Sequence, residues 1–113
     1  MKSYTDIEES KNLVEMGVDV STSDMYWRRD PFVEECLPRV TGFAGNVADD
    51  VPAWSLGALC EIIPGEFGLY KCGNIWYVTY YDNQGLGIYN EKAFSALSGV
   101  YELICWCHRE GLL

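Results

Sequence analysis

Residues 105–108, with the sequence Cys-Trp-Cys-His, place two thiols beside the single imidazole of the chain. A zinc site needs three or four convergent ligands. If this segment is helical, Cys105 and His108 share a face because they are three residues apart, whereas the second thiol points elsewhere. The chain has no CxxC pair, so Cys60 or Cys72 would have to complete the site. Cysteines that serve as small buried hydrophobic residues explain the pattern better, and we expect no metal site.

The same segment is also a candidate for cysteine catalysis. A nucleophilic cysteine needs a thiolate beside a base, and His108 is the one imidazole available. The packing that buries Cys105 and Cys107 in a helix would raise the pKa of both thiols and exclude a substrate. A histidine in the last helical turn has a structural explanation, since its positive charge there interacts favourably with the helix dipole. We therefore assign no catalytic residue.

Three pairs of adjacent acidic residues are the remaining candidates for chemistry: Glu8-Glu9, Glu34-Glu35 and Asp49-Asp50. Glycosidase-type catalysis needs two carboxylates that face each other across a cleft, and adjacent residues do not. Glycine-rich phosphate loops of the GxxxxGK[ST] or GxGxxG type are absent from the sequence. No cofactor is expected, and an enzyme without a recognisable motif is left as an alternative.

The composition is that of an acidic, well-packed domain. Of the 113 residues, 49% are hydrophobic and 14% aromatic, which is too apolar for a disordered chain. Eight basic residues stand against 17 acidic ones, a net charge of -9 that disfavours direct contact with nucleic acids or anionic membranes. The N-terminal residues do not resemble a signal peptide, and five cysteines without such a signal predict reduced thiols in the cytoplasm.

Three helices are predicted. The central one, residues 52–63, begins with Asp50 and Pro52 as boundary signals and carries an apolar face at i, i+3, i+4 and i+7. The first helix should start at a capping box of Thr5 and Glu8 and end near residue 16. The last helix is expected over residues 91–110, with Gly111 at its C′ position. Its broad apolar face includes Phe94. The residues expected to be buried in the core, on this helix and the central one, are Leu56, Leu59, Ile63, Leu97, Val100, Tyr101 and Ile104.

An antiparallel meander is predicted between the central and last helices. Residues 69–72 and 75–81 flank Gly73-Asn74, which is typical of a tight hairpin in which Tyr70 opposes Tyr77. A third strand is expected over residues 86–90, with Thr79 opposite Ile88. Residues 25–28 are a further strand candidate. Residues 28–50 are otherwise irregular and resemble an ordered loop anchored by Leu37 and Phe43, which could be a binding loop.

The clustering of aromatic residues in the meander predicts an interaction surface. If the helices cover the sheet face that bears Ile75, Tyr77 and Ile88, the other face remains open. The candidate interaction residues are then Lys71, Trp76, Tyr80 and Tyr89. Two alternatives are left open: the open strip lies on the Tyr70, Tyr77 and Tyr81 face, or another segment covers the second face as well.

Three segments resemble a family of small uncharacterised proteins from Bacteroides-type gut bacteria, their mobile elements and phages. The matching segments are residues 23–26 (Ser-Asp-Met-Tyr), residues 52–59 (Pro-Ala-Trp-Ser-Leu-Gly-Ala-Leu) and residues 102–106 (Glu-Leu-Ile-Cys-Trp) ahead of Arg109-Glu110-Gly111. The resemblance covers most of the chain apart from residues 28–50. It implies no known activity and brings no catalytic residue.

Together these features predict one α+β domain over residues 1–113: an antiparallel meander of three to four strands with about three helices mainly on one face. The preferred function is a non-enzymatic protein-interaction module that binds a protein partner or forms a homo-oligomer, with no direct contact to nucleic acid or membrane. The alternative is an acidic decoy or inhibitor that binds a basic, nucleic-acid-handling protein.

Overall fold

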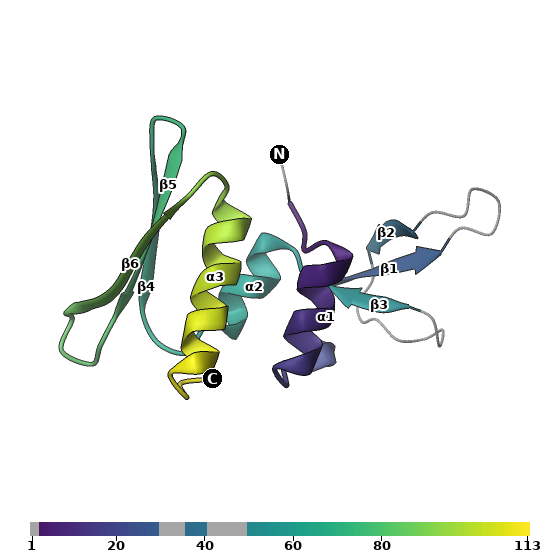
Figure 1. Cartoon of the computed structure of the whole chain (residues 1–113), viewed down its shortest axis with the longest axis horizontal. Helices are drawn as coiled ribbons and strands as arrows, with labels where there is room; N and C mark the ends of the chain where they lie inside the picture. The colour runs from purple at the N-terminus through teal and green to yellow at the C-terminus, as the bar shows by residue number, and fades with distance from the viewer. Residues whose placement is uncertain (1–2, 30–35, 41–49) are drawn as a thin grey trace. The chain divides into compact units, whose positions relative to one another are not determined.

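The computed structural model describes residues 3–29, 36–40 and 50–113 of the chain. These residues form three α-helices and six strands in two three-stranded antiparallel sheets (Figure 1). They divide into two compact units, residues 3–58 and residues 59–113. The α+β class and the three-stranded meander expected from the sequence are confirmed. That the chain folds as one domain stays a prediction.

Helix α1 (Ile7–Glu15) begins at Asp6 rather than at Thr5. The Asp6 carboxylate accepts a hydrogen bond from the Glu9 backbone N–H at 2.8 Å, and the Glu9 carboxylate accepts from the Asp6 N–H at 3.0 Å. This is a complete capping box, displaced by one residue from the predicted Thr5–Glu8 pair. Thr5 is not free to cap the helix because it is fully buried, with its hydroxyl 2.8 Å from the Ser10 hydroxyl.

The first sheet has the strand order β2-β1-β3 and lies in the N-terminal unit. Strand β1 (Met25–Arg29) pairs with β2 (Cys36–Val40) and with β3 (Val51–Ala53). The prediction of a strand over residues 25–28 is confirmed. Cys36–Val40 is a strand and not part of a loop, whereas Phe43, the second predicted loop anchor, lies outside the described residues.

Two predictions about the central helix are wrong at its N-terminal end. Pro52 lies in strand β3, and helix α2 (Leu56–Ile62) starts four residues later. Asp50 does not cap the helix, because its carboxylate accepts two hydrogen bonds from the Arg28 guanidinium, at 2.9 and 2.8 Å. Instead, Asp24 accepts from the backbone N–H and the hydroxyl of Ser55, the residue that immediately precedes α2. The acidic residue at the helix start therefore comes from a distant segment.

Trp54 joins three segments of the N-terminal unit. Its indole is fully buried, and its Nε1 donates to the Thr22 hydroxyl at 3.0 Å. Its backbone N–H donates to the Thr5 hydroxyl at 3.0 Å, while the Thr5 N–H donates to the Trp54 carbonyl at 2.9 Å. The residues before α1 are thereby fixed alongside the end of β3.

The C-terminal unit contains the meander, with the strand order β4-β5-β6. Strand β4 (Phe67–Cys72) and strand β5 (Ile75–Tyr81) are joined by a two-residue turn in which Gly73 has a φ of +63°. The predicted pairing of Tyr70 with Tyr77 is confirmed. Strand β6 (Gly87–Ala93) is shifted, since Thr79 pairs with Asn90 and not with Ile88. The turn is one residue longer than predicted, because Tyr81 pairs with Gly87 and not with Leu86, and an irregularity between Tyr80 and Tyr81 shifts the register by a second residue.

Helix α3 (Ala96–Arg109) begins five residues later than predicted, because the Ser95 side chain accepts from the Ser98 N–H and caps the helix there. The expected core is confirmed: apart from the half-buried Leu56, its members on α2 and α3 are buried. The prediction that Phe94 lies on the apolar face of the last helix is wrong. It precedes the helix and is 89% exposed. A hydrophobic staple would need a side chain at the fourth helical position, which is Gly99.

Candidate interaction surfaces

Helix α3 packs on the face of the meander that carries Val78 and Tyr80 (Figure 1). Val78 is fully buried, and a Cβ built on Gly99 of α3 would lie 2.7 Å from its Cγ2 atom. The absence of a side chain at Gly99 thus allows the helix backbone to approach the sheet closely. The predicted orientation is wrong: the helix covers this face and not the face bearing Ile75, Tyr77 and Ile88.

The four predicted interaction residues consequently have different environments. Tyr80 is buried, its hydroxyl donates to the Pro64 carbonyl, and its ring lies 5.7 Å from that of Trp106. Tyr89 is half-buried against the same indole, with 4.9 Å between the ring centroids. Lys71 is exposed, with its ammonium group 5.9 Å from the centroid of the half-buried Trp76 ring. These residues do not form a continuous exposed strip, because Tyr80 belongs to the core.

The opposite face of the meander is the exposed one, and we call it the open face. Tyr70 and Tyr77 stack on it with their ring centroids 5.1 Å apart and an interplanar angle of 14°. Tyr70 is 57% exposed, and Tyr77 is half-buried. The remaining strand residues of the open face with side chains are Cys72, Ile75, Thr79, Tyr81, Asn90 and Lys92. None of these strand residues carries a carboxylate, although the chain has a net charge of -9.

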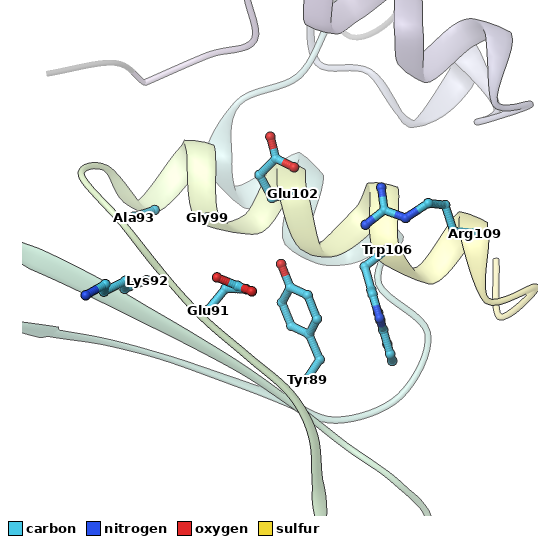
Figure 2. A pocket seen from close by; sticks show the side chains of 8 residues that line it. All are labelled: Tyr89, Glu91, Lys92, Ala93, Gly99, Glu102, Trp106 and Arg109. Carbon is cyan, nitrogen blue, oxygen red and sulfur yellow. The ribbon is translucent and has the colours of Figure 1, made fainter.

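A groove of about 430 Å³ runs between strand β6 and helix α3 (Figure 2). We call it the β6–α3 groove. The strand contributes the alternate residues Tyr89, Glu91 and Ala93, whose side chains point to the same side of the sheet, and also Lys92. From the helix comes a stripe with spacings of three, four and three residues. The lining residues are Tyr89, Glu91, Lys92 and Ala93 of β6 and Gly99, Glu102, Trp106 and Arg109 of α3.

The charged residues of the groove affect the pKa of the Tyr89 hydroxyl. Burial raises the pKa of Tyr89 to about 12, with Glu91 and Glu102 acting in the same direction and Arg109 lowering it. Figure 2 shows this hydroxyl directed toward α3, with Glu91 beside it. At neutral pH the phenol is therefore a neutral hydrogen-bond donor between carboxylates. Among the sequence-based candidates, only Tyr89 lines this groove.

Three sequence features relate to the groove: alternation along β6, a stripe of residues on α3, and a glycine in that stripe. They predict a groove only when the boundaries of β6 and α3 are known. Glu91 and Ala93 alternate with Tyr89 only if the strand continues beyond residue 90. Glu102, Trp106 and Arg109 share one helix stripe with Gly99, whose lack of a side chain was the sign of close helix–strand packing. Sequence reasoning assigned residues 91–93 to the helix and so missed the groove.

Burial disfavours the reactive thiolate form at two of the described cysteines. Cys107 is fully buried, and burial raises the pKa of its thiol. Burial likewise raises the pKa of Cys60, and Glu61 adds to the effect. His108 is exposed. Within residues 3–29, 36–40 and 50–113, no three His, Cys, Asp or Glu side chains converge in an arrangement suited to a metal ion.

The described helices are all too short or too polar to cross a membrane. No protein-family model, curated protein or solved structure matches the chain.

Proposed function

We propose that this chain is a non-enzymatic protein-interaction module that docks on a protein surface, including that of a second copy, through the open face. The observation that carries the proposal is an aromatic sheet face without carboxylates on a strongly acidic chain. The stacked Tyr70–Tyr77 pair supplies exposed aromatic area on this face. Interface centres are depleted in charged residues and enriched in tyrosine, and exposed apolar patches on soluble chains mark contact sites.

The polar groups of the open face fit the same role. The Thr79 hydroxyl lies 3.4 Å from the Asn90 side-chain oxygen, and Lys92 pairs across the strands with Tyr77. Lys92 is the only charged side chain among the paired strand residues of β5 and β6 on this face. A single cation at the rim favours contact with an acidic surface. The open face of a second copy offers apolar area but no strand carboxylate, so the contact to Lys92 would come from acidic residues next to that face. The chain would act in the cytoplasm with its thiols reduced.

The test is light scattering combined with size-exclusion chromatography on the purified protein and on a Tyr70→Ala/Tyr77→Ala variant. The unmodified protein should form a dimer that persists at high salt, because apolar contacts are not screened. The variant should weaken dimerisation by more than about 2 kcal/mol, as expected for interface hot spots. Phe94→Ala is the control, since it removes an aromatic ring that is even more exposed, 89% against 57% for Tyr70, at a position beyond the end of β6. Circular dichroism should show that both variants remain folded.

A second candidate function is supported by the net charge of -9. In this alternative the chain is an acidic decoy or inhibitor that binds a basic, nucleic-acid-handling protein. Such binding would be electrostatic and would be lost as the salt concentration rises. A monomer at all salt concentrations that binds a basic protein only at low salt would support the decoy and contradict docking through the open face.

A further inference from the structure

Strand β6 combines a free edge with a neighbouring helix. It pairs with β5 on one side and is the last strand of its sheet. Every second residue of an edge strand directs its backbone N–H and C=O groups outward, where they can pair with another chain. The β6–α3 groove runs along this strand. An extended peptide is the ligand that can use both features, because it adds a strand to the edge while alternate side chains enter the groove.

The shape of the groove changes along its length. At one end Ala93 and Gly99 lie close together, with the built Gly99 Cβ only 3.4 Å from the Ala93 Cβ. This end leaves space for small side chains only. Further along, the rings of Tyr89 and Trp106 form an aromatic wall whose centroids are 4.9 Å apart. A side chain with an apolar stem fits against this wall, whereas a short polar one would leave it in contact with water.

The charged residues of the groove determine which charge the ligand side chain should carry. Glu91 extends from the strand and Glu102 from the helix, and neither forms an ion pair with a lysine or arginine of the described residues. Figure 2 shows Lys92 and Arg109 toward opposite ends of the groove. A cation at the centre would be attracted by two carboxylates and by two aromatic faces. A second cation near Arg109 would be repelled.

We propose that the β6–α3 groove binds an extended basic peptide segment of a partner protein, which adds to the free edge of β6 as a fourth strand and inserts one arginine or lysine between Glu91 and Glu102. The aromatic wall of Tyr89 and Trp106 takes the stem of that side chain. This inference does not depend on docking through the open face, which lies on the other side of the sheet.

The probe is a capped heptapeptide with a central arginine flanked by threonines and valines, titrated into isotopically labelled protein. Amide chemical shifts should change in β6 and along the Gly99–Arg109 stripe of α3. A peptide with glutamate at the centre should bind at least about tenfold more weakly, which corresponds to one unfavourable charge contact. Two further peptides carry N-methyl groups on alternate backbone nitrogens, one peptide on the odd and one on the even positions. One of the two should lose affinity to a similar extent, because strand addition uses every second backbone N–H.

Glu102→Lys tests the groove from the side of the protein and should weaken binding of the arginine peptide at least about tenfold. Glu61→Lys is the matched control, because it reverses the same charge at an exposed position of α2 outside the groove and should leave the affinity unchanged. Equal binding of the arginine and glutamate peptides would overturn the proposal. It would also be overturned if both methylated peptides bound normally, if the shift changes fell on Tyr70 and Tyr77, or if no shift occurred at about 1 mM peptide.

Discussion

A side chain on Gly99 would bring its Cβ to 2.7 Å from Cγ2 of Val78, a distance at which one of the two groups must move. Val78 is a fully buried residue in the middle of β5, so it has little freedom to do so. We expect Gly99→Ala to lower the free energy of unfolding by about 1–3 kcal/mol, the usual cost of overpacking. Chemical denaturation followed by circular dichroism measures this change.

The control for this prediction is a second helical glycine, Gly57 of α2. A Cβ on Gly57 would meet only the Ser55 hydroxyl oxygen, at 3.9 Å. Gly57→Ala should therefore raise the free energy of unfolding by about 0.5–1 kcal/mol, because alanine is favoured over glycine in helices. If both variants were stabilised, the close approach of α3 to β5 would be wrong.

The Tyr89 hydroxyl should lose its proton at a higher pH than the hydroxyl of an ordinary tyrosine. Burial raises the pKa of Tyr89 to about 12 in the folded protein, against about 10 in an unfolded chain. The folded state therefore holds this proton more tightly. Its contribution to stability is complete below about pH 10 and is lost as the pH rises toward about 12. Ultraviolet difference spectra of the phenolate should show a late transition that is smaller in Tyr89→Phe, and Tyr80, whose pKa burial also raises, should account for the remainder. Equal late transitions in the unmodified protein and in Tyr89→Phe would contradict the prediction.

The thiols should react in the order of their exposure. Cys72 is exposed on the open face, whereas Cys107 is fully buried and its pKa is raised by that burial. Iodoacetamide should modify Cys72 at least about tenfold faster than Cys107, because the thiolate is the reacting form. Peptide mapping by mass spectrometry measures both rates. In denaturant the two rates should converge, and Cys72→Ser should lack the corresponding fast modification.

Leu59 tests the core beneath α2. It is 0% exposed, and removing its isobutyl group would leave a cavity. Leu59→Ala should lower the free energy of unfolding by about 2–5 kcal/mol. The half-buried Leu56 provides the comparison, and Leu56→Ala should cost clearly less. If chemical denaturation showed the same decrease in the free energy of unfolding for both variants, the prediction that Leu59 is the more deeply packed residue would be wrong.

The Thr5 hydroxyl is expected to matter more than the Thr5 methyl group. It accepts a hydrogen bond from the buried Trp54 N–H and lies 2.8 Å from the Ser10 hydroxyl. Thr5→Val keeps the shape but removes the acceptor of the buried Trp54 N–H, at a cost of about 1–3 kcal/mol in the free energy of unfolding, whereas the Ser10 hydroxyl still donates to the Asp6 carbonyl. Thr5→Ser retains the hydroxyl and should cost less in thermal or chemical denaturation. The reverse order would assign the role of Thr5 to apolar packing.

The meander was predictable from the sequence because its turn chemistry is local. Gly73-Asn74 between two runs of β-forming residues fixes the pairing of Tyr70 with Tyr77. The end of β6 was not predictable in this way, since residues 91–93 suit a helix as well as a strand. The Ser95 cap decides the boundary. Once β6 is extended, Asn90 and Lys92 join Thr79 on one face, and this polar content marks it as the exposed face.

Two strands of the N-terminal sheet, β2 and β3, were not predicted from the sequence because each contains a proline. Pro38 and Pro52 lack a backbone N–H and therefore argue against a strand. In the structure they pair with Trp27 and Tyr26 in β2 and β3, which are the two outer strands around β1. An outer strand tolerates proline because one of its sides needs no partner. A single sequence does not reveal which strands are outermost.

The hydrogen bonds between Thr5 and Trp54 join residues that are 49 positions apart in the chain. The hairpin between β4 and β5, by contrast, closes over the two residues Gly73-Asn74. Contacts between distant residues form slowly, because a long loop must close before any of them stabilises the chain. We therefore expect the later-synthesised half of the molecule to acquire its structure first. Pulsed hydrogen exchange during refolding should protect the β5 amides before the Trp54 amide.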